Sequence, residues 1–212
     1  TYPSGRVVTN FTELDGGLAG IASLVATAPF RNYAAAFSYT PSGAIKHLQL
    51  GNGLWESAQF NSRTQVTEIA LGNTPVTPIL WRLNYQYGEL DVYGNTDSTK
   101  NTGDVAKQTI SSSAMAAPLV QSYKYDSLDR IIDAKETFNG NQTWRQTFAY
   151  DRYGNRTSFS QNVVGQQTPI NSLTLPDVDP ATNRFRVEQG YGYDAVGNLT
   201  RDPTEREFVF NG

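Results

Sequence analysis

Tyr150-Asp151-Arg152-Tyr153-Gly154-Asn155-Arg156 is the most informative stretch of this chain, because close copies of it recur. The two best copies are Tyr125-Asp126-Ser127-Leu128-Asp129-Arg130-Ile131 and Tyr193-Asp194-Ala195-Val196-Gly197-Asn198-Leu199. The shared pattern is Tyr-Asp-x-x-Gly-(Asn/Arg)-x, with Asp129 in the glycine position of the copy at 125–131. Self-similar units of this kind are typical of repeat proteins, whose units stack side by side.

The residue types in each copy predict a strand, a tight turn and a return strand. An aromatic residue stands two positions before each tyrosine, so two rings share one face of the strand. The aspartate suits the first corner of a turn, where its carboxylate accepts hydrogen bonds from backbone N–H groups. The glycine supplies the positive φ that closes a hairpin built from a type I turn plus a bulge. We expect Asp129 to be tolerated there, because aspartate enters that region more readily than most residues.

Weaker copies extend the pattern over the rest of the chain. At 60–66 the glycine is replaced by Thr64, which would be strained at positive φ, so a different turn is expected there. Residues 208–212 read as the opening of a further copy, which indicates a piece of a longer protein. The uneven spacing of the copies favours hairpins of variable length in one sheet over a strict solenoid. The residues that carry the repeat signature are Tyr2, Gly5, Gly16, Tyr39, Gly43, Tyr125, Asp126, Tyr150, Asp151, Gly154, Tyr193, Asp194 and Gly197.

The composition agrees with this interpretation. Twelve Tyr and ten Phe against one Met favour strands, and 18 Gly and ten Pro supply many turns. We therefore predict an all-β fold in which antiparallel β-hairpin repeats form a continuous curled or spiralling sheet. Because the copies run from end to end, residues 1–212 are expected to form a single YD-repeat unit, a fragment of a longer protein.

Three other stretches carry structural signals. Gly51-Asn52-Gly53 is a strong hairpin turn between two strand-like segments. Residues 81–87 alternate strictly, with four aromatic or aliphatic side chains on one face and polar ones opposite, as in a half-buried strand. Residues 94–104 are predicted to form a polar loop, because Asn, Thr, Asp, Ser and Lys dominate there.

Charge and composition restrict the partners. The net charge is −3 with no run of basic residues, which argues against nucleic acid. The absence of cysteine excludes disulfides and zinc–thiolate sites. The most apolar segment, 18–30, is too short to cross a bilayer, so no membrane insertion is expected. No dinucleotide or phosphate-binding fingerprint is present, and no cofactor is predicted.

The sequence contains no recognisable catalytic constellation. A Ser-His-Asp triad would have to use His47, the only histidine, and no Gly-x-Ser-x-Gly elbow exists. The 20 acidic residues leave glycoside hydrolysis open, but nothing selects a pair of carboxylates. Asp177 and Asp179 lack the third acid and the glycine of a calcium loop. We predict no catalytic residue, no metal ligand and no enzymatic activity.

The three tryptophans allow a second interpretation. Trp55, Trp81 and Trp144 could stack on sugar rings, because an aromatic face fits the apolar face of a pyranose. The simpler interpretation is that they are core or wall-lining residues, since aromatic side chains dominate burial in general. A carbohydrate- or protein-binding surface module is therefore the alternative to a purely structural role.

The repeated motifs resemble those of the bacterial Rhs family, also called YD-repeat proteins, which are related to the teneurins of animals. The resemblance covers nearly the whole chain and is strongest at 144–156 and at 179–184 followed by 193–200. It implies an exported or cell-surface protein whose repeats form a long antiparallel sheet that spirals into a hollow shell. In toxin members of the family such a shell encloses a C-terminal toxic domain, which is released after self-cleavage.

The resemblance also implies partners. They would be the remaining repeats, the core region and the enclosed toxin domain of the same polypeptide, with glycans possible for the alternative function. The segment Asp202-Pro203-Thr204-Glu205 lacks the glycine of the family's Asp-Pro-x-Gly cleavage signature, so no catalytic residue is carried over. Because a segment cut from a sheet has open edges, the isolated chain is expected to self-associate through its edge strands.

Overall fold

The structure is a computed structural model, and it describes residues 3, 5–25, 28–77, 79–165 and 177–210. Its described residues are almost all strand, turn or loop, with two short 3-10 segments, η1 (Ser98–Lys100) and η2 (Val187–Gln189). Twelve strands form one antiparallel sheet that is not closed. The predicted all-β class, built from antiparallel hairpins in a continuous sheet, is confirmed.

The order of strands in the main sheet is the order of the sequence, with β1 and β14 as the outer strands. These strands are β1 (Val7–Thr12), β2 (Leu18–Val25), β3 (Ala28–Tyr39), β4 (Ile45–Leu50), β5 (Trp55–Phe60), β6 (Val66–Gly72), β7 (Trp81–Tyr87), β10 (Val105–Ser112), β11 (Leu119–Tyr125), β12 (Ile131–Phe138), β13 (Asn141–Tyr150) and β14 (Arg156–Val163). Three small pairs join β8 (Glu89–Leu90) to β9 (Thr96–Asp97), β15 (Val178–Asp179) to β16 (Arg184–Phe185), and β17 (Gly192–Tyr193) to β18 (Leu199–Arg201).

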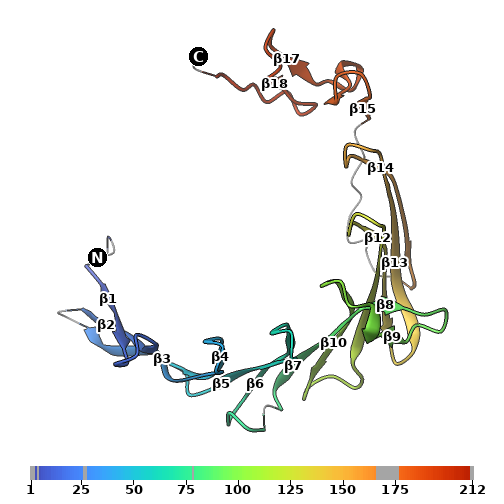
Figure 1. The fold of residues 1–212 in the computed structure, drawn as a ribbon. Helices are drawn as coiled ribbons and strands as arrows, with labels where there is room; N and C mark the ends of the chain where they lie inside the picture. Colours follow the sequence, from blue (N-terminus) through green and yellow to red (C-terminus); the bar gives the residue numbers. More distant parts are fainter. Residues whose placement is uncertain (1–2, 4, 26–27, 78, 166–176, 211–212) are drawn as a thin grey trace. The chain divides into compact units, whose positions relative to one another are not determined.

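The chain divides into two compact units. Unit 1 contains Thr1–Lys124 and Lys135–Thr143, and unit 2 contains Tyr125–Ala134 and Trp144–Gly212. In unit 1 the strands from β1 to β10 follow one another side by side in a single layer (Figure 1). That residues 1–212 fold as one unit stays a prediction.

A single layer offers no interior for large side chains. Among the described residues no large side chain is fully buried, and every buried apolar residue is an alanine: Ala22, Ala34, Ala70, Ala106 and Ala134. The hydrophobic contribution to the free energy of folding scales with the apolar area removed from water. In this sheet it comes from half-buried side chains that pack against same-face neighbours on adjacent strands.

The signature turns that belong to the main sheet lie along one of its edges. They join β1 to β2, β3 to β4, β5 to β6, β11 to β12 and β13 to β14. Because consecutive antiparallel strands reverse direction, every second connection returns to the same edge. The sheet therefore has one edge made of repeated turns and another made of unrelated connections.

Several signature hairpins also carry a register shift just inside the return strand. Tyr150 pairs with Arg156 but Ala149 pairs with Ser158, so Thr157 has no partner of its own. The same kind of shift follows the turns at 13–17, 61–65 and 194–198. Since a bulge increases local strand twist, the repeat introduces the same twist into one hairpin after another.

Two expectations from the sequence are wrong. The turn at 61–65 does not differ from the others: Thr64 takes φ 60°, and its N–H donates to the carbonyl of Asn61 at 3.0 Å. The stretch 94–104 is not a simple loop, because it contains β9 and η1. The hairpin at Gly51-Asn52-Gly53 is confirmed, with Gly53 at φ 85°.

Thr64→Gly should stabilise the chain. A left-handed backbone costs a residue with a Cβ roughly 1–2 kcal/mol, and glycine removes that cost while losing more entropy on folding. We expect a gain of up to about 1 kcal/mol in the free energy of unfolding, measured by urea denaturation. The matched control Thr109→Gly, in the middle of β10, should destabilise the chain by about 0.5–1 kcal/mol. A destabilised Thr64→Gly variant would contradict the turn geometry.

Candidate functional site

The aspartate of each signature turn holds the turn closed. Asp151 Oδ1 accepts from the N–H groups of Tyr153 at 2.8 Å and Asn155 at 2.9 Å, and Oδ2 accepts from Asn155 Nδ2 at 2.9 Å. Asp194 and Asn198 form the same arrangement. Asp126 has Arg130 in place of the asparagine, with Arg130 Nε donating at 2.8 Å. The predicted role of these aspartates in turns is thus visible in the hydrogen bonds.

The glycine of the signature takes a positive φ, which glycine adopts without strain. Gly154 lies at φ 90° and Gly197 at φ 97°, while Asp129 takes φ 57° in the same position. The earlier copies behave likewise, with Gly5, Gly16 and Gly43 at 75°, 87° and 84°. Tyr2 lies outside the described residues.

The tyrosine has a role that the sequence analysis missed. The hydroxyl of Tyr150 donates to the carbonyl of Ile131 at 2.9 Å, which is the first residue of the preceding return strand. Tyr39 donates to Leu18 at 2.8 Å and Tyr87 to Val66 at 2.7 Å, again at the first residue of a return strand. These three tyrosines therefore tie their hairpins to the ones before them. The only signal in the sequence is a separation of 19 to 21 residues between the bonded partners.

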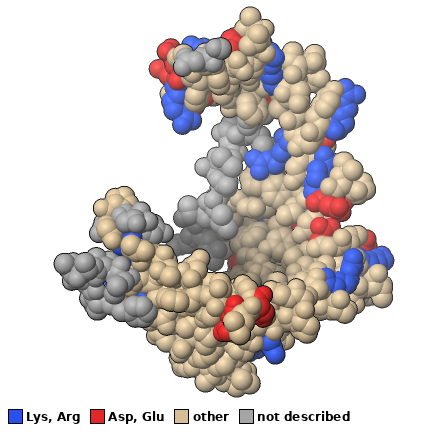
Figure 2. Space-filling view, turned by 60° about the vertical axis from the view of Figure 1, so that its left-hand side comes forward, with Lys and Arg blue, Asp and Glu red and all other residues tan. Residues whose placement is uncertain are grey.

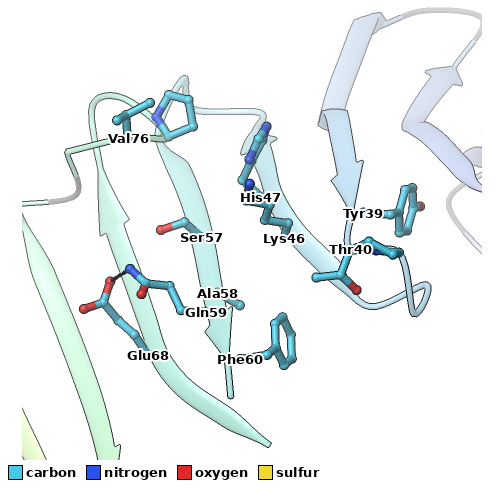
Figure 3. A pocket seen from close by; sticks show the side chains of 12 residues that line it. Tyr39, Thr40, Lys46, His47, Ser57, Ala58, Gln59, Phe60, Glu68 and Val76 are labelled. Atoms are coloured by element: carbon cyan, nitrogen blue, oxygen red, sulfur yellow. Dashed lines mark hydrogen bonds between the residues drawn. The ribbon is translucent and has the colours of Figure 1, made fainter. Parts of the chain in front are cut away.

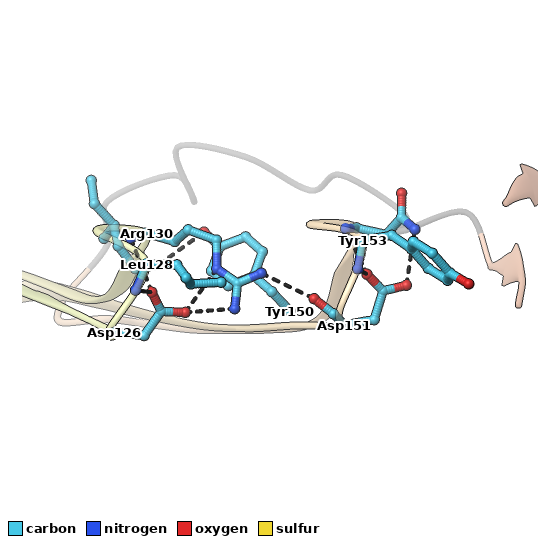
Figure 4. Close-up of polar contacts among 8 residues, drawn as sticks. Asp126, Leu128, Arg130, Tyr150, Asp151 and Tyr153 are labelled. Carbon is cyan, nitrogen blue, oxygen red and sulfur yellow. Dashed lines mark hydrogen bonds and ion pairs between the residues drawn. The ribbon is translucent and has the colours of Figure 1, made fainter.

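Arg130 connects two successive turns of unit 2 (Figure 4). Its guanidinium binds the carboxylate of Asp126, and Nη1 donates to the backbone carbonyl of Asp151 at 3.0 Å. The same guanidinium lies 4.7 Å from the centre of the Tyr150 ring, within the range of a cation–π contact. One side chain thus contacts an aspartate, a tyrosine and the next turn.

Two further copies of the turn were not recognised from sequence. Asp91 accepts from the N–H groups of Tyr93 and Asn95 in the β8–β9 hairpin. Asp202 accepts from Thr204 and Arg206, with Glu205 at φ 64° in the glycine position. The aspartate and its partner four residues later were the available signal. Leu90 and Arg201 in place of the tyrosine hid both copies.

The hydrogen bonds lower the pKa of the turn aspartates. For Asp151 and Asp194 the main cause is the side-chain amide of the asparagine four residues on, and for Asp126 it is the Arg130 side chain. For Asp202 the Thr204 hydroxyl is the main cause, and the pKa falls to about 2. These carboxylates are therefore ionised well below neutral pH.

The three tryptophans are all half-buried, and the register separates two of them. Trp55 pairs with Gly72, whereas Trp81 pairs with Leu71, the next residue along β6. Directly opposed residues share a face and successive residues alternate, so the indoles of Trp55 and Trp81 lie on opposite faces of the sheet. A ligand on one face can use only one of the two. Sugar binding by the three tryptophans stays a prediction.

A shallow depression lies over β4, β5 and β6 in unit 1 (Figure 3). It has a volume of about 570 Å³ and is lined by Tyr39, Thr40, Pro41, Lys46, His47, Ser57, Ala58, Gln59, Phe60, Glu68, Pro75 and Val76. Glu68 is only 8% exposed, and its carboxylate accepts from Gln59 Nε2 at 3.0 Å and Asn84 Nδ2 at 2.9 Å.

In the described part of the chain no three His, Cys, Asp or Glu side chains come together as a metal site would need. Within the same residues, neither helical segment has the length and apolar character needed to cross a membrane. On the face shown in Figure 2, lysines and arginines are interspersed with acidic side chains rather than gathered in one patch.

Tyr150→Phe should weaken the connection between hairpins without disturbing the ring. The variant loses the hydroxyl bond to Ile131, so the free energy of unfolding should fall by about 0.5–1.5 kcal/mol in urea denaturation. Tyr153→Phe is the matched control, because Tyr153 is 49% exposed at the tip of the following turn. Equal effects of the two substitutions would contradict the role assigned to the Tyr150 hydroxyl.

Acid should destabilise the fold through the turn aspartates. Their folded-state pKa lies below the unfolded value of about 3.9. The stability they contribute is therefore complete above about pH 4 and is lost as the pH falls toward about 2, the folded-state pKa of Asp202. Thermal unfolding measured from pH 5 to 2 should show this loss.

Asp151→Asn should reduce the loss on acidification. An asparagine already performs the role at 61–65, where Asn61 Oδ1 accepts from the N–H groups of Arg63 and Gln65. Glu56→Gln, at an exposed position of β5, is the matched control and should leave the acid profile unchanged. Identical profiles for Asp151→Asn and the parent chain would overturn this account.

No family model matches the sequence, and neither does any curated protein. Solved structures do match. A crystal structure of TcdB2-TccC3 without the hypervariable C-terminal region has 18% identity and a TM-score of 0.70, over 98% of this chain and 12% of the other. TcdB2-TccC3-Cdc42 has 18% identity and a TM-score of 0.67, over 93% and 11%.

A third structure, TcdB2-TccC3-TEV, has 19% identity and a TM-score of 0.58, over 75% of this chain and 8% of the other. The chain thus spans 8 to 12% of the length of these three proteins, which are Rhs or YD-shell proteins. At this level of identity the likeness concerns the fold. The chain has the fold of the Rhs or YD-repeat shell proteins, the family that its turn motifs resemble.

Proposed function

We propose that this chain is a non-enzymatic structural segment of an Rhs-type shell, and that the shell encloses or presents another region of the same polypeptide, such as a C-terminal toxin. The observation that carries the proposal is the repeated bond from Tyr39, Tyr87 and Tyr150 to the first residue of the preceding return strand. A sheet tied in this way is a wall that can be lengthened by adding hairpins. It does not need a core of its own.

The chemistry of the signature supports a structural role. The carboxylate oxygens of the repeat aspartates accept hydrogen bonds from the N–H groups of the turn and from the asparagine or arginine side chain four residues later. Their lowered pKa makes them poor proton donors at neutral pH, since a general acid works best with a pKa near the operating pH. The residues that define the family pattern are thus engaged in holding the hairpins.

The similar structures support the partners that we propose. One of them is described as lacking a hypervariable C-terminal region, which makes a variable C-terminal segment part of that protein. By analogy, further repeats, a core region and an enclosed toxin of the same polypeptide are the proposed partners here. A secreted or cell-surface location follows from the same analogy.

The outer strand β1 has the properties expected of a strand that pairs with a further strand in a longer sheet. All six of its residues, Val7–Thr12, are exposed, and none is charged. Proteins usually protect an open edge with charges, proline or a bulge in mid-strand. An unprotected edge of this kind is suited to pairing with another strand.

The edge therefore tests the proposal. We expect the isolated chain to self-associate in light scattering at high concentration, and Val8→Lys combined with Asn10→Lys to make it monomeric, because charged side chains block edge pairing. The control Thr109→Lys, on the interior strand β10, should leave the association unchanged. If the parent chain had the mass of a single chain at high concentration, this would count against a wall segment.

The non-enzymatic role has its own test. Turnover of a panel of ester, peptide or glycoside substrates that is lost in the Asp151→Asn variant would contradict it.

A further inference from the structure

We propose that a second depression of unit 1, between β3 and the β4–β5 turn, binds a phosphate group, either as inorganic phosphate or as a small phosphate monoester. Arg31, Tyr33 and Asn52 contact the ligand. Arg6 and Ser23 are positioning residues that hold the tyrosine. The site is independent of the wall function, since it uses none of the turn aspartates and none of the tyrosines that tie the hairpins together.

A bulge in β3 sets Tyr33 apart from its neighbours. The partners of Asn32 and Ala34 on β2 are consecutive residues, so Tyr33 has no partner on that strand. A bulge of this kind can redirect the side chain of the extra residue. The hydroxyl of Tyr33 meets that of Ser23 on β2, whose Oγ donates to it at 2.9 Å.

Two donors fix the Tyr33 hydroxyl. Ser23 Oγ, from a residue that is only 3% exposed, and Arg6 Nη1 both donate to its oxygen. These two hydrogen bonds favour the phenolate, and they lower the pKa of Tyr33, the Ser23 bond most and the Arg6 bond next. Because the oxygen accepts twice, the O–H is directed away from both donors, and none of the described residues accepts from it. Tyr33 therefore presents an oriented, acidic O–H to a ligand.

The depression beside this tyrosine has the size of a small-molecule site. Its volume is about 570 Å³, within the roughly 300–1,000 Å³ that is usual for ligand pockets. It is lined by Arg31, Asn32, Tyr33, Leu50, Gly51 and Asn52. The β4–β5 turn can form one wall because Gly51 lies directly against β3, where its N–H donates to the Tyr33 carbonyl at 2.8 Å. A Cβ at Gly51 would lie 1.9 Å from the carbonyl oxygen of Asn32, so only glycine allows this approach.

The turn contributes an amide donor to the depression. Asn52 Oδ1 accepts from the N–H of Leu54 at 3.1 Å, so its amide oxygen is engaged within the turn. The NH₂ group of Asn52 therefore faces away from the turn backbone, and no acceptor among the described residues contacts it. Asn52 and Tyr33 thus offer donors from the two walls of the depression.

The charges favour a dianion. No acidic side chain lines the depression, and among the described residues neither Arg6 nor Arg31 belongs to an ion pair. Arg31 stands directly opposite Ser23, so the two side chains share a face, and the charge of Arg31 also acts on the Tyr33 hydroxyl. A phosphate group has a charge of about −1.5 to −2 at pH 7 and three strong acceptor oxygens. It therefore balances two guanidinium groups, which a single carboxylate does not.

The test is calorimetric titration of the purified chain with sodium phosphate and, separately, with methyl phosphate, near neutral pH and at constant ionic strength. We expect a dissociation constant of about 1 mM, because exposed charges are screened, and weaker binding as sodium chloride is raised. Arg31→Gln should weaken binding by about tenfold, since it removes the charged donor fork. Lys46→Gln is the matched control, because it removes one positive charge from an exposed position of β4, and it should leave binding unchanged.

Arg6→Gln tests the positioning role. It removes one of the two donors to the Tyr33 hydroxyl, so it should raise the pKa of Tyr33 and weaken phosphate binding together. The pKa is followed by the ultraviolet absorbance of the phenolate, with Tyr33→Phe subtracted to isolate this residue. Arg6→Lys, which keeps a cationic donor, should restore part of both effects. An unchanged Tyr33 titration in Arg6→Gln would overturn the positioning role.

Circular dichroism and thermal unfolding show whether each variant keeps its strands. Because Arg31 is exposed, Arg31→Gln keeps the test open even if Tyr33→Phe, which leaves the buried Ser23 without its acceptor, fails to fold. Binding of either ligand supports the site, and the preference shows whether free phosphate or an ester is bound. The proposal is overturned if neither ligand binds at millimolar concentration, if sodium acetate binds as tightly as phosphate, or if Lys46→Gln weakens binding as much as Arg31→Gln. None of these results bears on the wall function, whose test is edge pairing.

Discussion

The bond from a signature tyrosine to the carbonyl that opens the preceding return strand is the interaction on which this structure depends. Backbone pairing alone joins strands but leaves their turns independent. The hydroxyl of Tyr150 bridges from one hairpin to the carbonyl of Ile131 in the previous one, and Arg130 reaches forward from that hairpin to the next turn. The aspartate closes the turn that follows Tyr150, with its carboxylate accepting from the N–H groups of Tyr153 and Asn155. The result is a sheet that is cross-linked along one edge.

This constraint explains how the described residues can fold without a core of large side chains. A two-layer domain holds itself together by burying one layer against another. Here the described residues form single layers in which the only buried apolar side chains are those of alanines. The larger apolar side chains are half-buried and pack against side chains on neighbouring strands. Stability then resembles that of other repeat proteins, in which each unit depends mainly on its neighbours. Such a sheet can separate two spaces and still expose both of its faces to ligands.

Much of the fold could be predicted from the sequence, because the repeat encodes it locally. The aspartate, the glycine and the alternating aromatics each impose a local geometry, so the hairpins and the all-β class followed directly. The turn at Thr64 was predicted wrongly, since the two backbone hydrogen bonds between Asn61 and Gln65 and between Thr64 and Asn61 outweigh an unfavourable φ when the flanking strands are paired. The tyrosine bond and the opposite faces of Trp55 and Trp81 could not be predicted, because both depend on the register between strands. Glu68 gave no signal, since a lone glutamate in a strand looks like a surface residue until its two amide neighbours are placed beside it.

The central claim is that hairpins joined by these bonds form part of a wall that continues beyond this segment. A cryo-electron microscopy structure of the full polypeptide that contains the segment tests this most directly. The account predicts a further strand paired along Val7–Thr12, the tyrosine-to-carbonyl bonds at Tyr39, Tyr87 and Tyr150, and density for another region of the polypeptide against one face of the sheet. A structure in which the edge of β1 faces solvent and both faces of the sheet are bare would contradict it.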